Sequence, residues 1–299
     1  MTESQMYEFP LPPVITDDDL KKCREHGDYC PVLFEWYKYV SELCTTFACI
    51  DPLSPAFQKI DALNHGVLIG LLCRCSRLMF SNIALSHEGL FGETTSILDR
   101  CIFESCVKII WLCEQNSKDK FTQFIADGLK TELKFKEEIN KNIISRNNNP
   151  LEIEKRMLAS IEHYIHSSGL TEEQINMASK LPSLFNMIDR DKSELLYVVA
   201  QKIGSHHVHG TWPSLFLHYI KLKENGFFSP RDHDCETHVN QYVLIPLLVL
   251  HAMESFIKFV FSKKEDMKSL LELLDSVRKE ILKINTEVVG NDFEIFKEI

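Results

Sequence analysis

Two long apolar stretches without helix breakers constrain the fold of this chain more than any other feature of its sequence. Residues 55–86 carry apolar residues in runs, and two glycines are the only potential breakers after the first residue of the stretch. Residues 93–115 are similarly apolar and contain neither glycine nor proline. Because apolar runs of this length exceed ordinary strands, each stretch predicts one long and largely buried helix.

The composition points to the same fold class. The 299 residues include only 11 glycines and 11 prolines, which is few for the many tight turns of a β-sandwich or barrel. Hydrophobic residues make up 44% of the chain and charged residues 25%, which is the balance of a globular protein and not of a disordered one. We therefore predict an all-α protein, a single-domain multi-helix bundle with long antiparallel helices.

The chain shows no internal repeat and no linker long enough to divide it. We expect an N-terminal arm, residues 1–15, and one helical domain, residues 16–299, with its core at residues 55–262. In that core, the two long helices should form an antiparallel pair covered by the C-terminal helices. Thr16 is followed by three aspartates and predicts a capped helix to about residue 26. Further helices are predicted at residues 31–49, 118–145, 151–166, 193–202, 212–224, 235–262 and 264–289, with a short one after Thr171, and a loop is predicted at residues 226–234 with extended structure at Phe227 and Phe228.

The last predicted helix, residues 264–289, carries an apolar seam with alternating steps of three and four residues. This spacing is typical of a helix face that packs along another helix. The partner helix is either in the same chain or in a second copy, and we expect a homodimer. The seam consists of Met267, Leu270, Leu274, Val277, Ile281, Ile284 and Val288.

Charge and cysteine usage narrow the class of protein further. The net charge is −10, so a nucleic acid could be bound only by a local basic patch. The ten cysteines are spread through apolar, helix-like stretches, and we interpret them as buried free thiols. Cys73 and Cys75 have no second cysteine pair at zinc-ligand spacing, so no structural zinc site is predicted.

The location of the protein is predicted from two segments. The first nine residues show no basic segment before an apolar core, so no signal peptide is expected. Residues 242–261 are the most apolar stretch, but Pro246, His251, Glu254 and Lys258 interrupt it, which indicates a buried helix and not a membrane span. We predict a cytoplasmic protein without contact to a membrane.

Three charged residues, Arg100, Glu104 and Lys108, are spaced four apart on an otherwise apolar helix. One interpretation is a set of surface ion pairs between neighbouring helical turns. The other is that the stripe lines an interior cleft, where buried ionisable groups are paired and often functional.

Three histidines, His206, His207 and His209, cluster between Ser205 and Trp212. Imidazole can both accept and donate a proton near neutral pH, so a general acid/base role is one interpretation. A metal site is another, with His163, His166 or residues 232–235 as further ligands, and a histidine-capped helix end without chemistry is the third. We predict no metal and no cofactor.

The two segments, Arg100-x-x-x-Glu104 and Ser205-x-x-x-His209-Gly210, resemble those of a family of uncharacterised all-helical bacterial proteins. That family is similar in size and helix order to abortive-infection proteins and to the HEPN group of helical ribonucleases, and the resemblance covers residues 55–253. It implies an effector of bacterial defence or toxin type that acts on RNA, with a metal-independent ribonuclease activity.

The resemblance also implies roles for individual residues. His209 or His207 would act as general acid/base, Arg100 and Lys202 would offset phosphate charge, and Glu104 would orient Arg100. Ser205 belongs to the same catalytic set, and Lys108 and Trp212 would contribute to binding. At the histidine cluster Lys202 stands where HEPN ribonucleases carry arginine, and Arg156 with His163 matches their Arg–His spacing elsewhere in the chain.

Two other function classes stay open at the level of sequence. The first is a non-catalytic helical binding module that holds a protein partner, such as an antitoxin, or a small ligand. The second is a metal-dependent hydrolase. Basic residues also gather in residues 130–155, either as a solvated helix face or as an RNA-contacting patch. The central expectation is that Arg100, Glu104 and His209 belong to one site.

Overall fold

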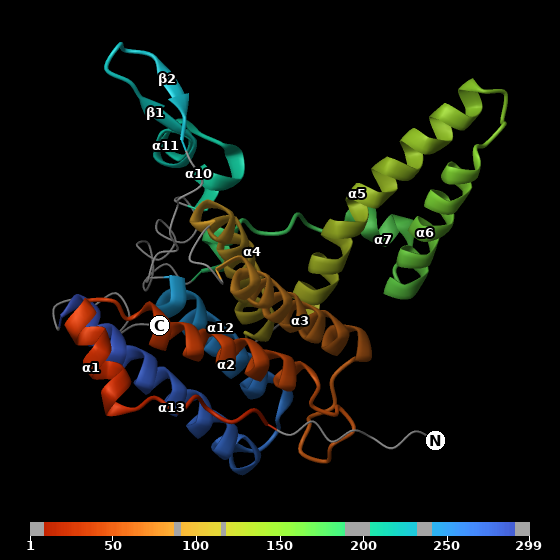
Figure 1. The fold of residues 1–299 in the computed structure, drawn as a ribbon. Coiled ribbons are helices and arrows are strands. Elements are labelled where there is room, and N and C mark those ends of the chain that lie inside the picture. The colour runs from red at the N-terminus through yellow and green to blue at the C-terminus, as the bar shows by residue number, and fades with distance from the viewer. Residues whose placement is uncertain (1–8, 87–90, 115–117, 189–203, 232–240, 291–299) are drawn as a thin grey trace. The chain divides into compact units, whose positions relative to one another are not determined.

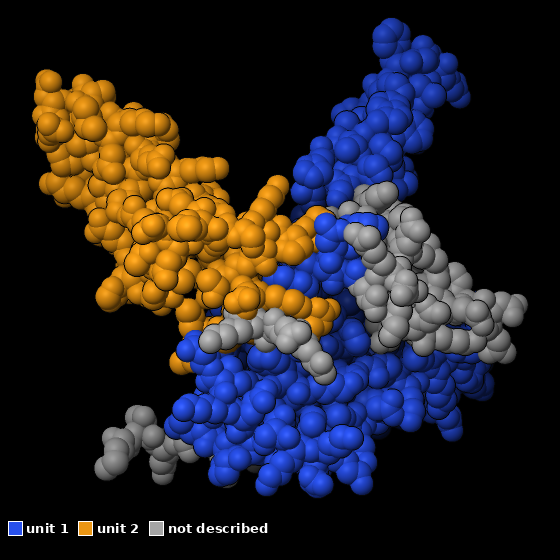
Figure 2. All heavy atoms as spheres, turned by 180° about the vertical axis from the view of Figure 1, so that it is seen from behind, with its two compact units in different colours: residues 1–61, 65–113, 184–299 blue, residues 62–64, 114–183 orange. Residues whose placement is uncertain are grey.

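The computed structural model describes residues 9–86, 91–114, 118–188, 204–231 and 241–290 (Figure 1). The chain divides into two compact units, of which unit 1 comprises residues 1–61, 65–113 and 184–299 and unit 2 comprises residues 62–64 and 114–183 (Figure 2). The prediction of an all-α protein is confirmed, since helices dominate and the described residues hold one two-stranded sheet. That residues 16–299 form a single domain stays a prediction.

Unit 1 contains the long apolar helices and the C-terminal helices. Its elements are α1 (Asp17–His26), α2 (Cys30–Ala48), nearly all of α3 (Ala62–Leu85), α4 (Gly92–Cys113), α8 (Leu184–Met187), α10 (Gly204–His209), α11 (Trp212–Ser214), a π-helical turn η3 (Leu215–Tyr219), strands β1 (Ile220–Leu222) and β2 (Phe228–Pro230), α12 (Gln241–Val260) and α13 (Lys264–Val289).

Helices α3 and α4 form the predicted antiparallel pair. Asn82 Nδ2 lies 2.7 Å from Asp99 Oδ1, and Cys75 Sγ lies 3.7 Å from Cys106 Sγ. The partner of the earlier α3 residue, Cys75, thus comes later in α4 than the partner of Asn82, so the two helices run in opposite directions. Helix α12 packs on α4 and α2, so it covers α4 as expected. Helix α13 packs on α12 and α2 and does not contribute a comparable contact to the α3–α4 pair.

The apolar seam of α13 is buried within the chain. Leu274, Val277, Ile281 and Ile284 are each at most 3% exposed. Glu254 of α12 accepts hydrogen bonds from Lys258 and from Arg278 of α13, both at 2.6 Å. Helices α12 and α2 of the same chain pack on α13, so this buried seam is not exposed for a second copy. The homodimer stays a prediction without an assigned surface.

Local capping signals place several helix ends where the sequence predicts them. Thr16 Oγ1 accepts from the Asp19 amide at 3.2 Å, and the Asp19 carboxylate accepts from the Thr16 amide at 3.0 Å. Thr171 and Gln174 form the same reciprocal pair at the start of α7 (Glu172–Met177). These pairs satisfy amides that the first turn of a helix leaves without partners.

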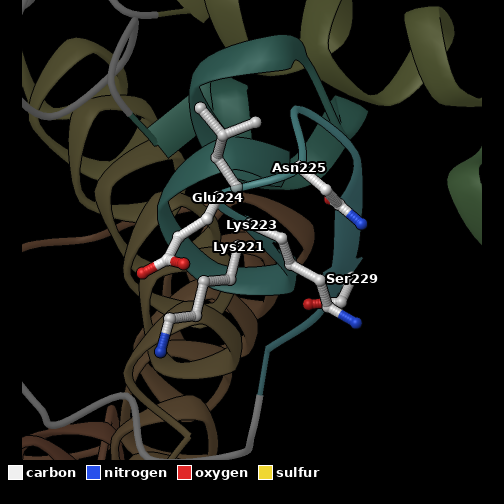
Figure 3. A pocket seen from close by; sticks show the side chains of 6 residues that line it. Lys221, Lys223, Glu224, Asn225 and Ser229 are labelled. Atoms are coloured by element: carbon white, nitrogen blue, oxygen red, sulfur yellow. The ribbon is translucent and has the colours of Figure 1, made fainter.

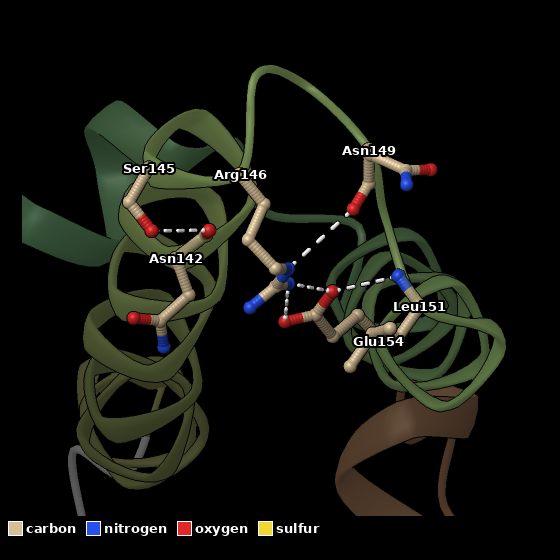
Figure 4. A network of polar contacts seen from close by, with 6 residues as sticks. All are labelled: Asn142, Ser145, Arg146, Asn149, Leu151 and Glu154. Atoms are coloured by element: carbon tan, nitrogen blue, oxygen red, sulfur yellow. Dashed lines mark hydrogen bonds and ion pairs between the residues drawn. The ribbon is translucent and has the colours of Figure 1, made fainter.

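Unit 2 is built from α5 (Lys118–Ser145), α6 (Glu152–Ser168) and α7, around buried Leu129, Leu133 and Ile175. The predicted loop between α5 and α6 is held by Arg146, whose guanidinium binds both oxygens of Glu154 (Figure 4). The same carboxylate accepts from the Leu151 amide at 2.8 Å. The hydrogen bond from Arg146 is the main reason that the pKa of Glu154 is lowered.

Two of the predicted helix ranges are wrong. Residues 55–61 are not helical, because they pair with the end of α12: the Gln58 amide donates to the Val260 carbonyl at 2.8 Å, and Phe57 forms an antiparallel bridge with Phe261. Residues 212–224 do not form one helix but α11, η3 and β1 in turn. The hairpin that β1 forms with β2 turns at Gly226, whose φ of +79° favours glycine.

The remaining sequence predictions have mixed outcomes. Cys44, Cys75 and Cys106 are buried free thiols as expected, but Cys49 is exposed. Residues 193–202 and 235–240 lie outside the described residues. Helices α3 and α12 are long and apolar enough to cross a membrane by length and composition, a criterion that buried core helices also meet. The predicted cytoplasmic location is not tested by this finding.

Candidate functional site

The charged stripe of α4 is a pair and not a triplet. Arg100 Nη1 lies 2.5 Å from Glu104 Oε1, and the two side chains are 14% and 32% exposed. Lys108 is half-buried and forms no ion pair or hydrogen bond with the described part of the chain. The low exposure of Arg100 favours an interior position for the pair over a surface ion pair.

Helix α10 brings the second sequence motif to this pair. It packs on α4, and the Nε atom of Arg100 lies 3.5 Å from the Ser205 hydroxyl oxygen, to which it donates. A guanidinium has five N–H donors, so Arg100 can bind Glu104 and Ser205 and still donate to an anion. The two motifs therefore meet although 105 residues separate Arg100 from Ser205.

The histidines of α10 divide by helix face. A helix advances about 100° per residue, so residue 209 lies on nearly the same face as Ser205, whereas residue 207 lies on the opposite face. His209 is exposed and makes no hydrogen bond, ion pair or ring contact with the described residues. The arrangement thus places Arg100, Glu104 and Ser205 together, and the contact between this group and His209 stays a prediction.

The other two histidines have neighbours in the segment that follows. His206 Nδ1 lies 2.7 Å from Thr211 Oγ1, and the Thr211 amide donates to the His206 carbonyl at 3.2 Å, which fits a histidine that holds a helix end. His207 Nδ1 lies 3.4 Å from Ser214 Oγ, and its ring centroid lies 4.9 Å from that of His218.

Sequence reasoning placed Ser214 near the histidines but did not single out Thr211 and His218 as neighbours of the cluster. Ser214 follows His207 by seven residues and His218 follows Ser214 by four, and these helix-like spacings were the available signal. Trp212, predicted to bind, is 59% exposed and packs its ring against Phe216 and Phe228. Lys202 lies outside the described residues.

A buried polar network fixes α4 beside the Arg100 pair. Asp99 Oδ1 accepts from Asn82 Nδ2 at 2.7 Å and from Gln241 Nε2 at 3.2 Å. Asn82 also donates to the Tyr37 hydroxyl at 2.9 Å, and Thr95 donates to Gln241 Oε1 at 3.0 Å. The network joins α2, α3, α4 and α12 and so holds the residue that precedes Arg100.

Burial controls the protonation of this network. It raises the pKa of Asp99 well above its usual value, and the hydrogen bonds from Asn82 and Gln241 lower that pKa only in part. Burial and the nearby Asp99 also raise the pKa of Tyr37 well above 10.0, while the hydrogen bond from Asn82 acts in the opposite direction. Asp99 therefore favours its neutral form more than an exposed aspartate does.

Two other interpretations concern a metal site and an RNA-contacting basic patch. Within the part of the chain that the structure describes, no three His, Cys, Asp or Glu side chains come close enough to hold a metal ion. Residues 232–235, named as alternative ligands, are outside that part. In residues 130–155, Lys136 pairs with Glu162 and Glu172, and Arg146, Lys141 and Lys155 pair with glutamates of unit 2, so these cations are already neutralised.

Together these features define an all-α protein with a partly buried arginine–carboxylate pair, covered by a short histidine-bearing helix. Residues 65–228 match the profile of a family of unknown function, DUF5677. The match spans more than half of the chain and includes both motifs, so the protein belongs to this family. No curated protein and no solved structure matches the chain.

Proposed function

We propose that this protein is an effector of bacterial defence or toxin type that cleaves RNA without a metal ion, similar in activity to HEPN ribonucleases. The observation that carries the proposal is the contact of Arg100, mostly buried and paired with Glu104, with Ser205 of the histidine-bearing helix α10. A guanidinium held in place by a carboxylate is well suited to bind a phosphate group.

In the proposed reaction, His209 removes the proton of the RNA 2′-hydroxyl. The 2′-oxygen then attacks the adjacent phosphorus atom, and the bond from phosphorus to the 5′-oxygen breaks as that oxygen takes a proton from water. The products are a 2′,3′-cyclic phosphate and a 5′-hydroxyl. Arg100 offsets the negative charge that develops on the phosphoryl oxygens, Glu104 positions Arg100, and Ser205 contacts the guanidinium on its other side.

The choice of His209 over His207 rests on two observations. His209 shares the helix face of Ser205 and is exposed, so that a substrate held by Arg100 can reach it. His207 lies on the opposite face and contacts Ser214 and His218. Under this proposal, His206 and His207 stabilise the helix end and the following turn.

The test is cleavage of a labelled single-stranded RNA by the full-length chain in buffer with EDTA. His209→Ala should lower the rate about 100-fold or more, because loss of a general base typically has at least this effect. The matched control is His163→Ala, an exposed histidine of α6 that forms an Arg–His match with Arg156. Full activity of His209→Ala, or loss of activity only in His163→Ala, would overturn the assignment.

Arg100 is tested by two variants. Arg100→Lys keeps the charge but loses the planar donor pattern, and Arg100→Gln loses both, so activity should fall in that order. Circular dichroism of both variants checks the fold. A folded Arg100→Gln variant with unchanged cleavage would remove the phosphate-binding role.

A second candidate, a non-catalytic binding module, is favoured by one observation. Large apolar side chains remain exposed along residues 208–228, among them Trp212, Phe216, Leu217 and Phe227. Exposed apolar groups clustered in one short segment often mark an interaction surface. A chain that binds RNA or a protein but shows no cleavage in the same assay would support this candidate.

A further inference from the structure

The hairpin that follows the candidate site combines exposed cations with an exposed aromatic ring. Strands β1 and β2 pair with Lys221 opposite Ser229, and the Lys223 amide donates to the Phe227 carbonyl at 2.8 Å. Directly opposed residues lie on the same face of a two-stranded ribbon, and so do residues two apart along a strand. Lys221, Lys223 and Ser229 therefore share one face.

Within the described part of the chain, no acidic side chain neutralises these lysines. Neither Lys221 nor Lys223 forms an ion pair or a side-chain hydrogen bond with any described residue, in contrast to most cations of residues 130–155. Residues 204–231 hold three basic residues, Lys221, Lys223 and Arg231, and one acidic residue, Glu224. In a chain with a net charge of −10, this segment is locally positive.

The two lysines line a surface hollow with Leu222, Glu224, Asn225 and Ser229 (Figure 3). Ammonium, amide and hydroxyl groups can all donate hydrogen bonds to phosphate oxygens, whereas the Glu224 carboxylate opposes an anion. Phe227 follows the turn and is 73% exposed, the highest exposure of any described aromatic ring. A ring this open offers a flat face on which an unpaired base can stack.

The face of the hairpin opposite the lysines is the one that packs against the rest of unit 1. Phe228 lies opposite Leu222, on the other face from the lysines, and packs with Trp212 and Phe216 at centroid distances of 5.8 and 6.4 Å. This aromatic cluster joins the hairpin to α11 and η3. Among the described residues no aromatic cluster packs on the lysine face, so its exposed groups can contact a ligand.

We propose that the Lys221–Lys223 face of the hairpin binds single-stranded RNA, with the lysines at phosphate groups and Phe227 stacked on a base. This inference rests on the proposed function and names the substrate form of the same site. Ring contacts connect the hairpin to α10: His207 lies 4.9 Å from His218, which lies 6.3 Å from Tyr219, the residue before β1. The hairpin is thus packed next to the helix that carries Ser205 and His209.

The test measures binding of a labelled 20-nucleotide single-stranded RNA to the full-length chain by fluorescence anisotropy, at several salt concentrations. Lys221→Gln/Lys223→Gln should weaken binding about tenfold and should flatten the slope of log K against log salt by roughly 1.4, the value for two phosphate contacts on a single strand. Lys263→Gln/Lys264→Gln removes the same charge from two exposed lysines elsewhere and should leave binding unchanged.

The stacking contact is tested separately. Phe227→Ala should weaken binding roughly tenfold, and Phe227→Tyr should restore it, since a tyrosine ring can also stack. Phe80→Ala, which removes another exposed aromatic ring of unit 1, is the control and should bind as wild type does. A duplex RNA of the same sequence should bind more weakly, because its bases are already stacked.

The outcomes separate this inference from the proposed function. His209→Ala should bind RNA as wild type does, and the lysine variant should still cleave a dinucleotide that is too short to reach the hairpin. Binding without cleavage would leave the inference standing and would refute only the ribonuclease proposal. Equal RNA affinity of wild type and both hairpin variants would overturn the inference, as would binding to vesicles of anionic phosphatidylserine with no binding to RNA.

Discussion

Replacement of Asp99 tests how α4 is held in place beside Arg100. Asp99→Ala removes the acceptor of two enclosed donors, Asn82 Nδ2 and Gln241 Nε2. Asn82 keeps its second bond, to the Tyr37 hydroxyl. A buried donor left without a partner costs about 1–3 kcal/mol, so two of them should lower the free energy of unfolding by about 2–6 kcal/mol.

Asp99→Asn is the matched variant because it keeps an oxygen that can accept both hydrogen bonds. The asparagine cannot ionise, so the variant also changes how stability depends on pH. The direction of that change follows from the pKa of Asp99. The pKa of Asp99 is raised in the folded state, so its contribution to stability is complete below the unfolded value of 3.8 and is lost as the pH rises through the raised folded value. Relative to wild type, Asp99→Asn should therefore become more stable as the pH rises from 5 to 8.

The assay is urea unfolding followed by tryptophan fluorescence at pH 5, 7 and 8. The three tryptophans all belong to unit 1, so the signal reports on the unit that contains the network. If Asp99→Ala lies within about 0.5 kcal/mol of wild type, the network does not hold α4. Parallel pH dependence of wild type and Asp99→Asn would refute the assignment of a raised pKa.

Three further perturbations have defined outcomes. Ile281→Glu places a charge on the buried α13 seam and should destabilise unit 1 by several kcal/mol, whereas a stable variant that only changes the mass measured by light scattering would assign the seam to a dimer. Ile175→Ala should cost about 2–5 kcal/mol and increase hydrogen exchange in residues 118–183; an equal increase in α12 would show that the units unfold together. Glu254→Gln should lower stability more at pH 7 than at pH 3. Burial tends to raise the pKa of Glu254, but the hydrogen bonds from Lys258 and Arg278 lower it overall, so its contribution to stability decreases as the pH falls through that lowered value. A constant difference between pH 7 and pH 3 would contradict that reasoning.

The helices were predictable wherever the signal is local. Thr16 and Thr171 mark their caps, and the amphipathic helix at residues 264–289 begins and ends where the spacing predicts. The hairpin was not predictable in this way. Its strands are only three residues long, and their pairing depends on the turn at Gly226 and on the packing of Phe228 against Trp212. Apolar spacing in residues 212–222 is equally compatible with a helix.

The candidate site was predictable in its residue types and only partly in its geometry. The charges of Arg100 and Glu104 stand out in an apolar helix, and so does the histidine cluster. The burial of Arg100 and its contact with Ser205 depend on the packing of α10 on α4, which no local spacing encodes. The same holds for Asp99, whose partners come from α3 and α12.

The central claim is that Arg100 and His209 act on the 2′-hydroxyl and phosphate of RNA. The most direct measurement uses an RNA oligonucleotide and a copy with a single 2′-deoxy sugar at the cleavage position, incubated with the full-length chain in EDTA, with the product ends identified by mass spectrometry. The account predicts a 2′,3′-cyclic phosphate from the RNA, no cleavage at the deoxy position and no product from His209→Ala. Cleavage at the deoxy position, or cleavage by His209→Ala at the wild-type rate, would contradict it.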